Sequence, residues 1–135
     1  SRVFFAYSFR PENKELVSMT RDLLVAMGFE VIEGEDPRPA SVSEKVKQKI
    51  NFCDVLVALM TRDSQNEKGE WLPSNWVQQE AVFALGRETP VIRVLEEGVS
   101  TQGKIFGDQE HILIRRDNPA EGLVRLARMI SSYRK

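Results

Sequence analysis

A single acidic residue, Glu80, occupies a position at which its sequence neighbours predict an apolar side chain. At about 100° per residue, the segment that starts at Trp76 predicts a helix, and Glu80 projects from the middle of its apolar arc. The other members of the arc are Trp76, Val77, Ala81, Phe83, Ala84 and Leu85. A carboxylate among apolar neighbours costs free energy unless it is paired, hydrogen-bonded or placed at a cleft. The pattern is typical of a catalytic acid, but it also fits an acid near the start of its helix, where the helix dipole favours it.

Other catalytic signatures are absent from the sequence. No Gly-x-Gly-x-x-Gly follows the first apolar segment and no Gly-x4-Gly-Lys-Ser/Thr occurs, which excludes ordinary dehydrogenases and P-loop ATPases. One cysteine, Cys53, and one histidine, His111, cannot form an internal disulfide or a zinc site by themselves. Without a Gly-x-Ser-x-Gly elbow, His111 is interpreted as structural. We expect no metal and no bound cofactor.

Composition limits the class of protein. The 135 residues, 41% hydrophobic and 29% charged with a net charge of −1, predict one globular domain spanning 1–135. The chain starts at Ser1, so we expect a piece excised from a larger protein or a product of tag removal. The near-neutral charge argues against nucleic-acid binding, and the longest apolar run is far too short to span a membrane. The lone cysteine indicates a reducing, cytoplasmic location.

Short β-type segments alternate with amphipathic helical segments along the chain. Strands are predicted over 2–8, 29–32, 53–60, 90–95 and 111–114, and helices over about 16–27, 41–50, 74–86 and 119–133. Ser41 and Glu44 have the spacing of a capping box. The alternation predicts an α/β fold with a five-stranded, mostly parallel sheet and helices on both faces. Ligands bind beyond the carboxyl ends of such strands, a rim formed here by 8–12, 33–40, 61–73 and 96–109.

Several segments together resemble a TIR domain, the Toll/interleukin-1 receptor fold, over nearly the whole chain. They are the first strand Val3-Phe-Phe-Ala-Tyr-Ser8, the apolar run ending Ala58-Leu-Met-Thr61, the long polar loop 61–73, and Ser74-Asn-Trp-Val-Gln-Gln-Glu80. The Trp-x-x-x-Glu spacing after the third strand is similar to that of NAD-cleaving TIR domains, including bacterial antiphage effectors. The resemblance implies a flavodoxin-like TIR fold, an NAD+ glycohydrolase or cyclase of immune or antiphage signalling, and Glu80 as the catalytic glutamate.

The resemblance also points to further contacts on the rim. The candidates for substrate binding are Tyr7, Ser8, Phe9, Arg10, Arg38, Trp71, Ser74 and Trp76. Arg10 could meet the pyrophosphate, although TIR NADases often have arginine at the position of Ser8. Tyr7, Phe9 and Trp71 could stack on a ring, while Trp76 is expected to orient Glu80. Arg38 lies in the Pro37-Arg-Pro39 loop, which corresponds to the loop that bridges neighbouring TIR domains.

One carboxylate is enough for this chemistry. Nicotinamide leaves NAD+ as a neutral base and needs no general acid. The carboxylate of Glu80 could stabilise the ribosyl oxocarbenium ion by its charge, bind the ribose hydroxyls through hydrogen bonds, or act as a transient nucleophile. By the family pattern, self-association completes the active sites, a fused or separate sensor domain controls them, and the isolated domain is weakly active. Two alternatives stay open: a non-catalytic TIR scaffold that signals by homotypic association, and an enzyme resembling nucleoside deoxyribosyltransferases. A response-regulator receiver fits less well, because no acidic pair follows the first strand.

Overall fold

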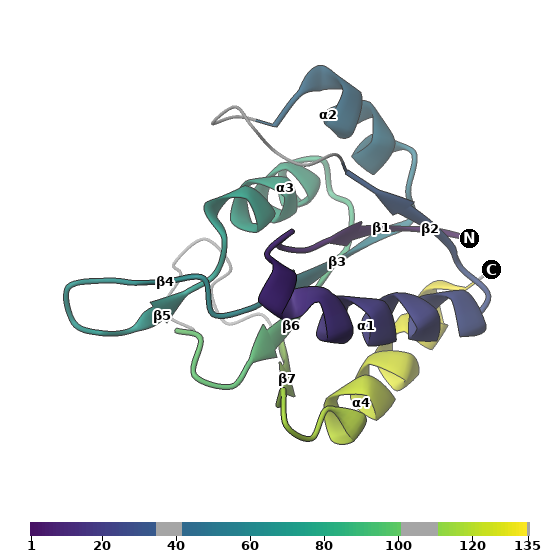
Figure 1. Cartoon of the computed structure of the whole chain (residues 1–135). Coiled ribbons are helices and arrows are strands. Elements are labelled where there is room, and N and C mark those ends of the chain that lie inside the picture. The colour runs from purple at the N-terminus through teal and green to yellow at the C-terminus, as the bar shows by residue number, and fades with distance from the viewer. Residues whose placement is uncertain (35–41, 101–110, 135) are drawn as a thin grey trace.

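One parallel sheet organises the part of the chain that the computed structural model describes, residues 1–34, 42–100 and 111–134. Its five strands lie in the order β2-β1-β3-β6-β7, and all neighbouring pairs are parallel (Figure 1). The strands are β1 (Arg2–Ala6), β2 (Glu30–Glu33), β3 (Val55–Met60), β6 (Val91–Glu96) and β7 (His111–Ile114). The predicted five-stranded α/β fold is confirmed.

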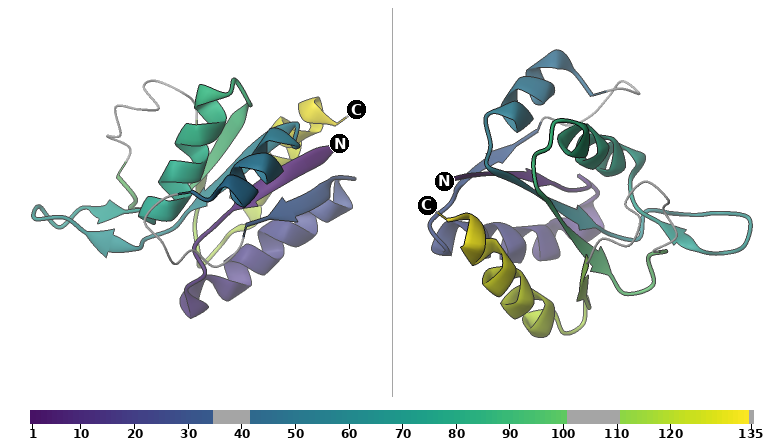
Figure 2. Two further views of the ribbon diagram at one scale, coloured as in Figure 1. Left: turned by 90° about the horizontal axis from the view of Figure 1, so that it is seen from above. Right: turned by 180° about the vertical axis from the view of Figure 1, so that it is seen from behind.

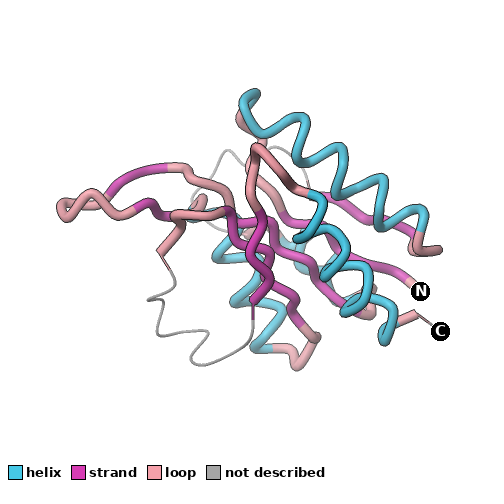
Figure 3. Tube along the Cα trace, turned by 90° about the horizontal axis from the view of Figure 1, so that it is seen from below, coloured by secondary structure: helices cyan, strands magenta, loops and turns pink. Residues whose placement is uncertain are grey.

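Two layers of helices cover the sheet. One face packs against α1 (Lys14–Ala26) and α4 (Ala120–Ile130), and the other against α2 (Glu44–Asn51) and α3 (Asn75–Gly86). Figure 2 shows α1 and α3 on opposite sides of the sheet, and Figure 3 shows helices flanking the strands on both sides. Two short 3₁₀ turns, η1 (Pro11–Asn13) and η2 (Ser131–Tyr133), precede α1 and follow α4. None of the described helices combines the length and apolar character that a membrane crossing needs.

The period of two in β1 explains how one strand serves both layers. Val3 and Phe5 belong to the core beneath α1 and α4, whereas Phe4 and Ala6 belong to the core beneath α2 and α3. In β3, all six residues are buried, as expected of a central parallel strand covered on both faces. Glu80 is on α3 and therefore faces the same side of the sheet as Phe4.

Two local predictions are wrong. The side chain that caps α2 is Ser43, whose Oγ accepts a hydrogen bond from Val46 N at 3.2 Å; Ser41 lies outside the described residues. The helix therefore begins at Glu44, and the cap is two residues later than the capping-box spacing predicts. The segment 61–73 is not entirely loop, because β4 (Ser64–Gln65) and β5 (Trp71–Leu72) pair antiparallel in a short hairpin.

The close packing of α4 on β7 depends on Gly122. A Cβ at this position would lie 2.8 Å from Leu113 O and 2.9 Å from Ile114 Cβ. We expect Gly122→Ala to lower the free energy of unfolding by about 1–3 kcal/mol, since the backbone of β7 cannot move aside as a flexible side chain would. Denaturant titration measures the effect, and Gly86→Ala is the control because a Cβ there meets nothing within 4 Å. Equal stabilities of the two variants would contradict this packing argument.

Candidate active site

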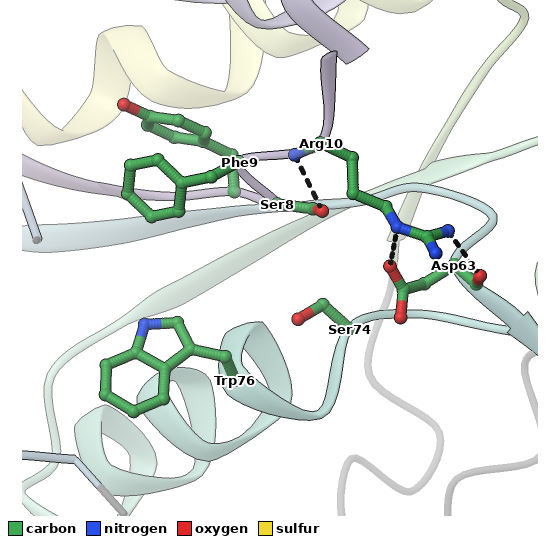
Figure 4. Close-up of a pocket in the computed structure, with 7 residues that line it drawn as sticks. Ser8, Phe9, Arg10, Asp63, Ser74 and Trp76 are labelled. Atoms are coloured by element: carbon green, nitrogen blue, oxygen red, sulfur yellow. Dashed lines mark hydrogen bonds and ion pairs between the residues drawn. The ribbon is translucent and has the colours of Figure 1, made fainter. Parts of the chain in front are cut away.

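The topology of the sheet creates a switch point between β1 and β3. After β1, the chain first adds β2 on one side and then β3 on the other, so the connections leave the carboxyl ends of β1 and β3 in opposite directions. A pocket of about 340 Å³ lies there (Figure 4). Its lining residues come from the end of β1, from the segment after β3 and from the start of α3, namely Tyr7, Ser8, Phe9, Arg10, Asp63, Ser74 and Trp76.

Aromatic side chains form one part of the pocket wall. The rings of Tyr7 and Phe9 have centroids 5.0 Å apart, and Tyr7 also packs on Phe5 at 4.8 Å. Both Tyr7 and Phe9 follow the end of β1 at Ala6; Tyr7 is half-buried and Phe9 is exposed. Arg21 Nη2, on α1, donates a hydrogen bond to the Tyr7 hydroxyl at 3.1 Å. In Figure 4, Trp76 and Ser74 lie across the pocket from Phe9 and Ser8.

An ion pair closes the opposite part of the wall. Arg10 Nη1 donates to the backbone oxygen of Asp63 at 2.7 Å, and Arg10 Nε lies 3.4 Å from Asp63 Oδ1 and 3.6 Å from Glu12 Oε1. About half of the Arg10 side chain is exposed, so these contacts are weak enough to be exchanged for a ligand. Arg10 is therefore the cation that a phosphate would meet at this wall, at the cost of its contact with Asp63.

Glu80 is buried beside the carboxyl end of β2. Only 2% of the residue is exposed. A Cβ added at Gly34, directly after β2, would lie 3.1 Å from Glu80 Oε2 and 3.4 Å from Phe4 Cζ, so the carboxyl group occupies space that a side chain at position 34 would fill. Within the described residues, Oε2 has no hydrogen-bond partner and no cation pairs with the carboxyl group. The group is thus placed in an apolar site without the compensation that buried carboxylates normally have.

This environment favours the protonated acid. Burial raises the pKa of Glu80 to about 8, although the indole N–H of Trp76 acts in the opposite direction. The effect of Trp76 on this pKa places its N–H near the carboxyl group, but Trp76 Nε1 and Glu80 Oε2 each lack a hydrogen-bond partner in the described parts of the chain, so the two groups do not reach full hydrogen-bond geometry. Trp76 stands one turn before Glu80 on α3 and also lines the pocket, whereas Glu80 is not among its lining residues. Trp76 thus connects the pocket to the buried acid.

The structure gathers most of the predicted substrate-binding residues but not all of them. The pocket brings together Tyr7, Ser8, Phe9, Arg10, Ser74 and Trp76. Trp71 is separate, because the β4–β5 hairpin carries it to a second pocket of about 670 Å³ with Arg62, Glu96 and Arg116. Arg38 lies outside the described residues. Asp63 was not predicted as a site residue; its place three residues after a fully buried strand is the signal that could have found it.

No protein-family model matches the sequence, and the comparison with curated proteins finds no match either. Solved structures that are similar in fold include an N-glycosidase and a TIR domain. The CMP N-glycosidase BcmB of Clostridium botulinum has a TM-score of 0.61 and 18% sequence identity, with 93% of this chain and 98% of that chain covered. The TIR domains of the activated Roq1 resistosome, which recognises the pathogen effector XopQ, have a TM-score of 0.52 and 15% identity, with 98% of this chain and 82% of that chain covered.

At these identities the comparisons show the fold alone. They confirm the resemblance that the sequence predicts, since a TIR domain aligns with almost the whole chain. They also show that the fold of this chain is similar to that of a nucleotide N-glycosidase. The chain therefore has the TIR fold.

Proposed function

We propose that the chain cleaves the bond between nicotinamide and ribose in NAD+, with Glu80 as the catalytic carboxylate, and that it acts in immune or antiphage signalling in the cytoplasm. The observation that carries the proposal is the buried Glu80 carboxyl group, without a cationic partner among the described residues, one helical turn from a pocket at the switch point. The similarity of the fold to an N-glycosidase supports the same reaction class.

The proposed reaction needs one charge from the protein. The C1′–N bond breaks, its electron pair goes to the nicotinamide ring nitrogen, and neutral nicotinamide departs. The ribosyl oxocarbenium ion that remains is stabilised by the ionised Glu80 carboxylate, because opposite charges attract strongly in a site that excludes water. Water then adds to C1′ and releases its proton, which yields ADP-ribose; attack by a group of the adenine instead yields a cyclic product.

The raised pKa of Glu80 couples protonation to the charge of the substrate. A pyridinium cation beside the carboxyl group favours its ionised form, so binding of NAD+ releases the proton that the empty site holds. Because the acid is 2% exposed, we expect contact with substrate only after Trp76 moves aside. Self-association of TIR domains, with Arg38 at the contact, would drive this movement and make activity depend on clustering.

A second candidate is an enzyme that cleaves the N-glycosidic bond between a sugar and an uncharged base, either a hydrolase or a transferase resembling nucleoside deoxyribosyltransferases. Two features favour it. The alignment with the CMP N-glycosidase BcmB includes 98% of the BcmB chain, and the pKa of Glu80, about 8, leaves the acid protonated at pH 7. A neutral pyrimidine or purine leaves more readily when it receives a proton. In this reaction Glu80 would donate that proton instead of stabilising the cation as a carboxylate.

The two candidates differ in substrate and in pH dependence. Concentrated or artificially clustered chain should be incubated with NAD+ and with CMP, and the released nicotinamide or cytosine measured by chromatography between pH 6 and 9. The proposal predicts nicotinamide release with a kcat/KM that rises toward pH 8, because the free enzyme must ionise Glu80. Cytosine release that falls above pH 8 would support the second candidate. Release of neither base under any clustering condition would favour the non-catalytic scaffold.

A further inference from the structure

The carboxylate of Glu96 joins three segments at the carboxyl edge of the sheet. Glu96 ends β6 and is 3% exposed. Its Oε1 accepts hydrogen bonds from the backbone N–H of Arg62 and from Arg116 Nη2, both at 3.0 Å. Its Oε2 accepts from Arg116 Nε at 2.8 Å. Glu96 therefore links the segment after β3 to the segment after β7.

Arg116 extends this network to the segment that follows β1. Besides its two bonds to Glu96, the guanidinium donates from Nη1 to the backbone oxygen of Glu12 and from Nη2 to Asn13 Oδ1, the latter at 2.7 Å. Asn13 is 1% exposed, and its backbone N–H donates to Arg10 O at 3.0 Å. One guanidinium thus fixes the turn that ends the Ser8–Arg10 wall of the pocket.

The second wall is attached to the same carboxylate. Arg62 donates its backbone N–H to Glu96, and its Nε donates to Glu97 O at 2.7 Å. The next residue, Asp63, lines the pocket and pairs with Arg10. These contacts connect Glu96 to both pocket walls. On one side they run through Arg62 and Asp63 to Arg10, and on the other through Arg116 and Asn13 to Arg10.

The charge state of Glu96 suits this arrangement. Burial alone would raise its pKa, but the hydrogen bonds from Arg116 and from the Arg62 N–H outweigh burial and hold the pKa below its ordinary value. The carboxylate is therefore ionised near neutral pH, and its hydrogen bonds to charged groups are of the strong, charge-assisted kind. Neither Glu96 nor Arg116 lines the switch-point pocket, so any effect on that pocket must pass through the two segments that they hold.

We propose that Glu96 and Arg116 are positioning residues that set the separation of the two pocket walls and so determine how well the substrate is bound. The inference rests on the proposed function for its kinetic consequence, but not for its structural one. A pocket whose walls are already held in place loses less conformational freedom when a ligand binds. Loosening the walls should therefore raise KM more than it lowers kcat.

Arg116→Lys is the sharpest variant. Lysine keeps the positive charge beside Glu96 but lacks the planar fork that reaches Glu96, Glu12 and Asn13 at once. We expect faster hydrogen exchange at the backbone amides of Asn13, which donates to Arg10 O, and of Arg62, which donates to Glu96, and a kcat/KM that falls about 10- to 100-fold, mainly through KM. Glu96→Gln should show the same pattern if it folds, as circular dichroism will establish.

Arg115→Gln is the matched control. It removes an exposed ion pair with Glu97 at 3.2 Å, next to Arg116 in the sequence, and should leave exchange at Asn13 and Arg62 unchanged. Exchange that is unchanged at both amides in folded Arg116→Lys would overturn the inference, as would faster exchange at Asn13 alone, because the walls would then be independent. If the unmodified chain releases no base, the proposed function fails while the exchange result still decides the role of Glu96 and Arg116.

Discussion

Replacement of Glu80 by glutamine is expected to lower the rate of nicotinamide release by about 10³-fold, the size of effect seen when one preorganised electrostatic stabiliser is removed. Glutamine keeps the volume and a carbonyl oxygen toward Trp76 but carries no negative charge, so it cannot stabilise the oxocarbenium ion. The assay is release of nicotinamide from NAD+ by clustered protein. KM should change far less than kcat, because the charge acts in the transition state.

Glu88→Gln supplies the control for this experiment. Glu88 follows α3 but is exposed, so loss of its charge should leave turnover unchanged. If Glu80→Gln and the unmodified chain release nicotinamide at equal rates, Glu80 takes no part in the reaction and the proposed mechanism is wrong. If Glu80→Gln loses activity only because it unfolds, circular dichroism will show it, and Glu80→Asp becomes the variant that tests position without removing charge.

The sheet could be predicted because its strands are short segments rich in apolar and β-branched residues, with helical segments between most of them. The run Val55–Met60 is buried throughout, as its uninterrupted hydrophobicity predicts, and parallel pairing follows from the helices that separate the strands. Glu80 could be predicted as unusual because helical periodicity places it on an apolar face, and that face proves to be buried. Its role in catalysis stays a prediction.

Other features depend on contacts that no local pattern encodes. Trp71 shares the rim with the predicted substrate residues, but a short hairpin of polar sequence turns it toward a different pocket. Asp63 and Arg10 are 53 positions apart, and only the parallel pairing of β1 with β3 brings them together. In the sequence, Glu96 has no feature that distinguishes it from a surface acid. In the structure it is buried, and it accepts hydrogen bonds from Arg116 and from the backbone of Arg62. Long-range polar pairs of this kind were not predictable.

The fold by itself supports more than one function, since similar folds carry unrelated activities. Of the similar structures named above, one is an N-glycosidase and the other belongs to a resistosome, so similarity of fold does not distinguish a catalytic function from a role in assembly. Features of the candidate site must therefore distinguish an enzyme from a non-catalytic scaffold. A scaffold needs no ionisable group in an apolar position, and such a group costs stability at every pH at which it tends to ionise. That cost is measurable.

Glu80 should make the stability of the chain fall as pH rises from about 4.5 to about 8. In this window the unfolded chain, with the ordinary glutamate pKa of 4.5, has lost the proton, while the folded chain, with a pKa of about 8, retains it. The folded state then binds one proton more than the unfolded state, so the free energy of unfolding falls by about 1.4 kcal/mol per pH unit. Below the window both states are protonated, and above it both are ionised, so the effect levels off at each end.

The measurement is the difference in unfolding free energy between Glu80→Gln and the unmodified chain, from urea titrations at pH 4, 6 and 8. Every other titrating group, including Glu96 with its lowered pKa, contributes almost equally to both proteins and cancels in the difference. We expect the two proteins to be similar at pH 4 and the variant to gain by several kcal/mol at pH 8. A difference that does not change with pH would mean that Glu80 ionises freely in the folded chain, and the buried acid on which the proposed catalysis depends would not exist.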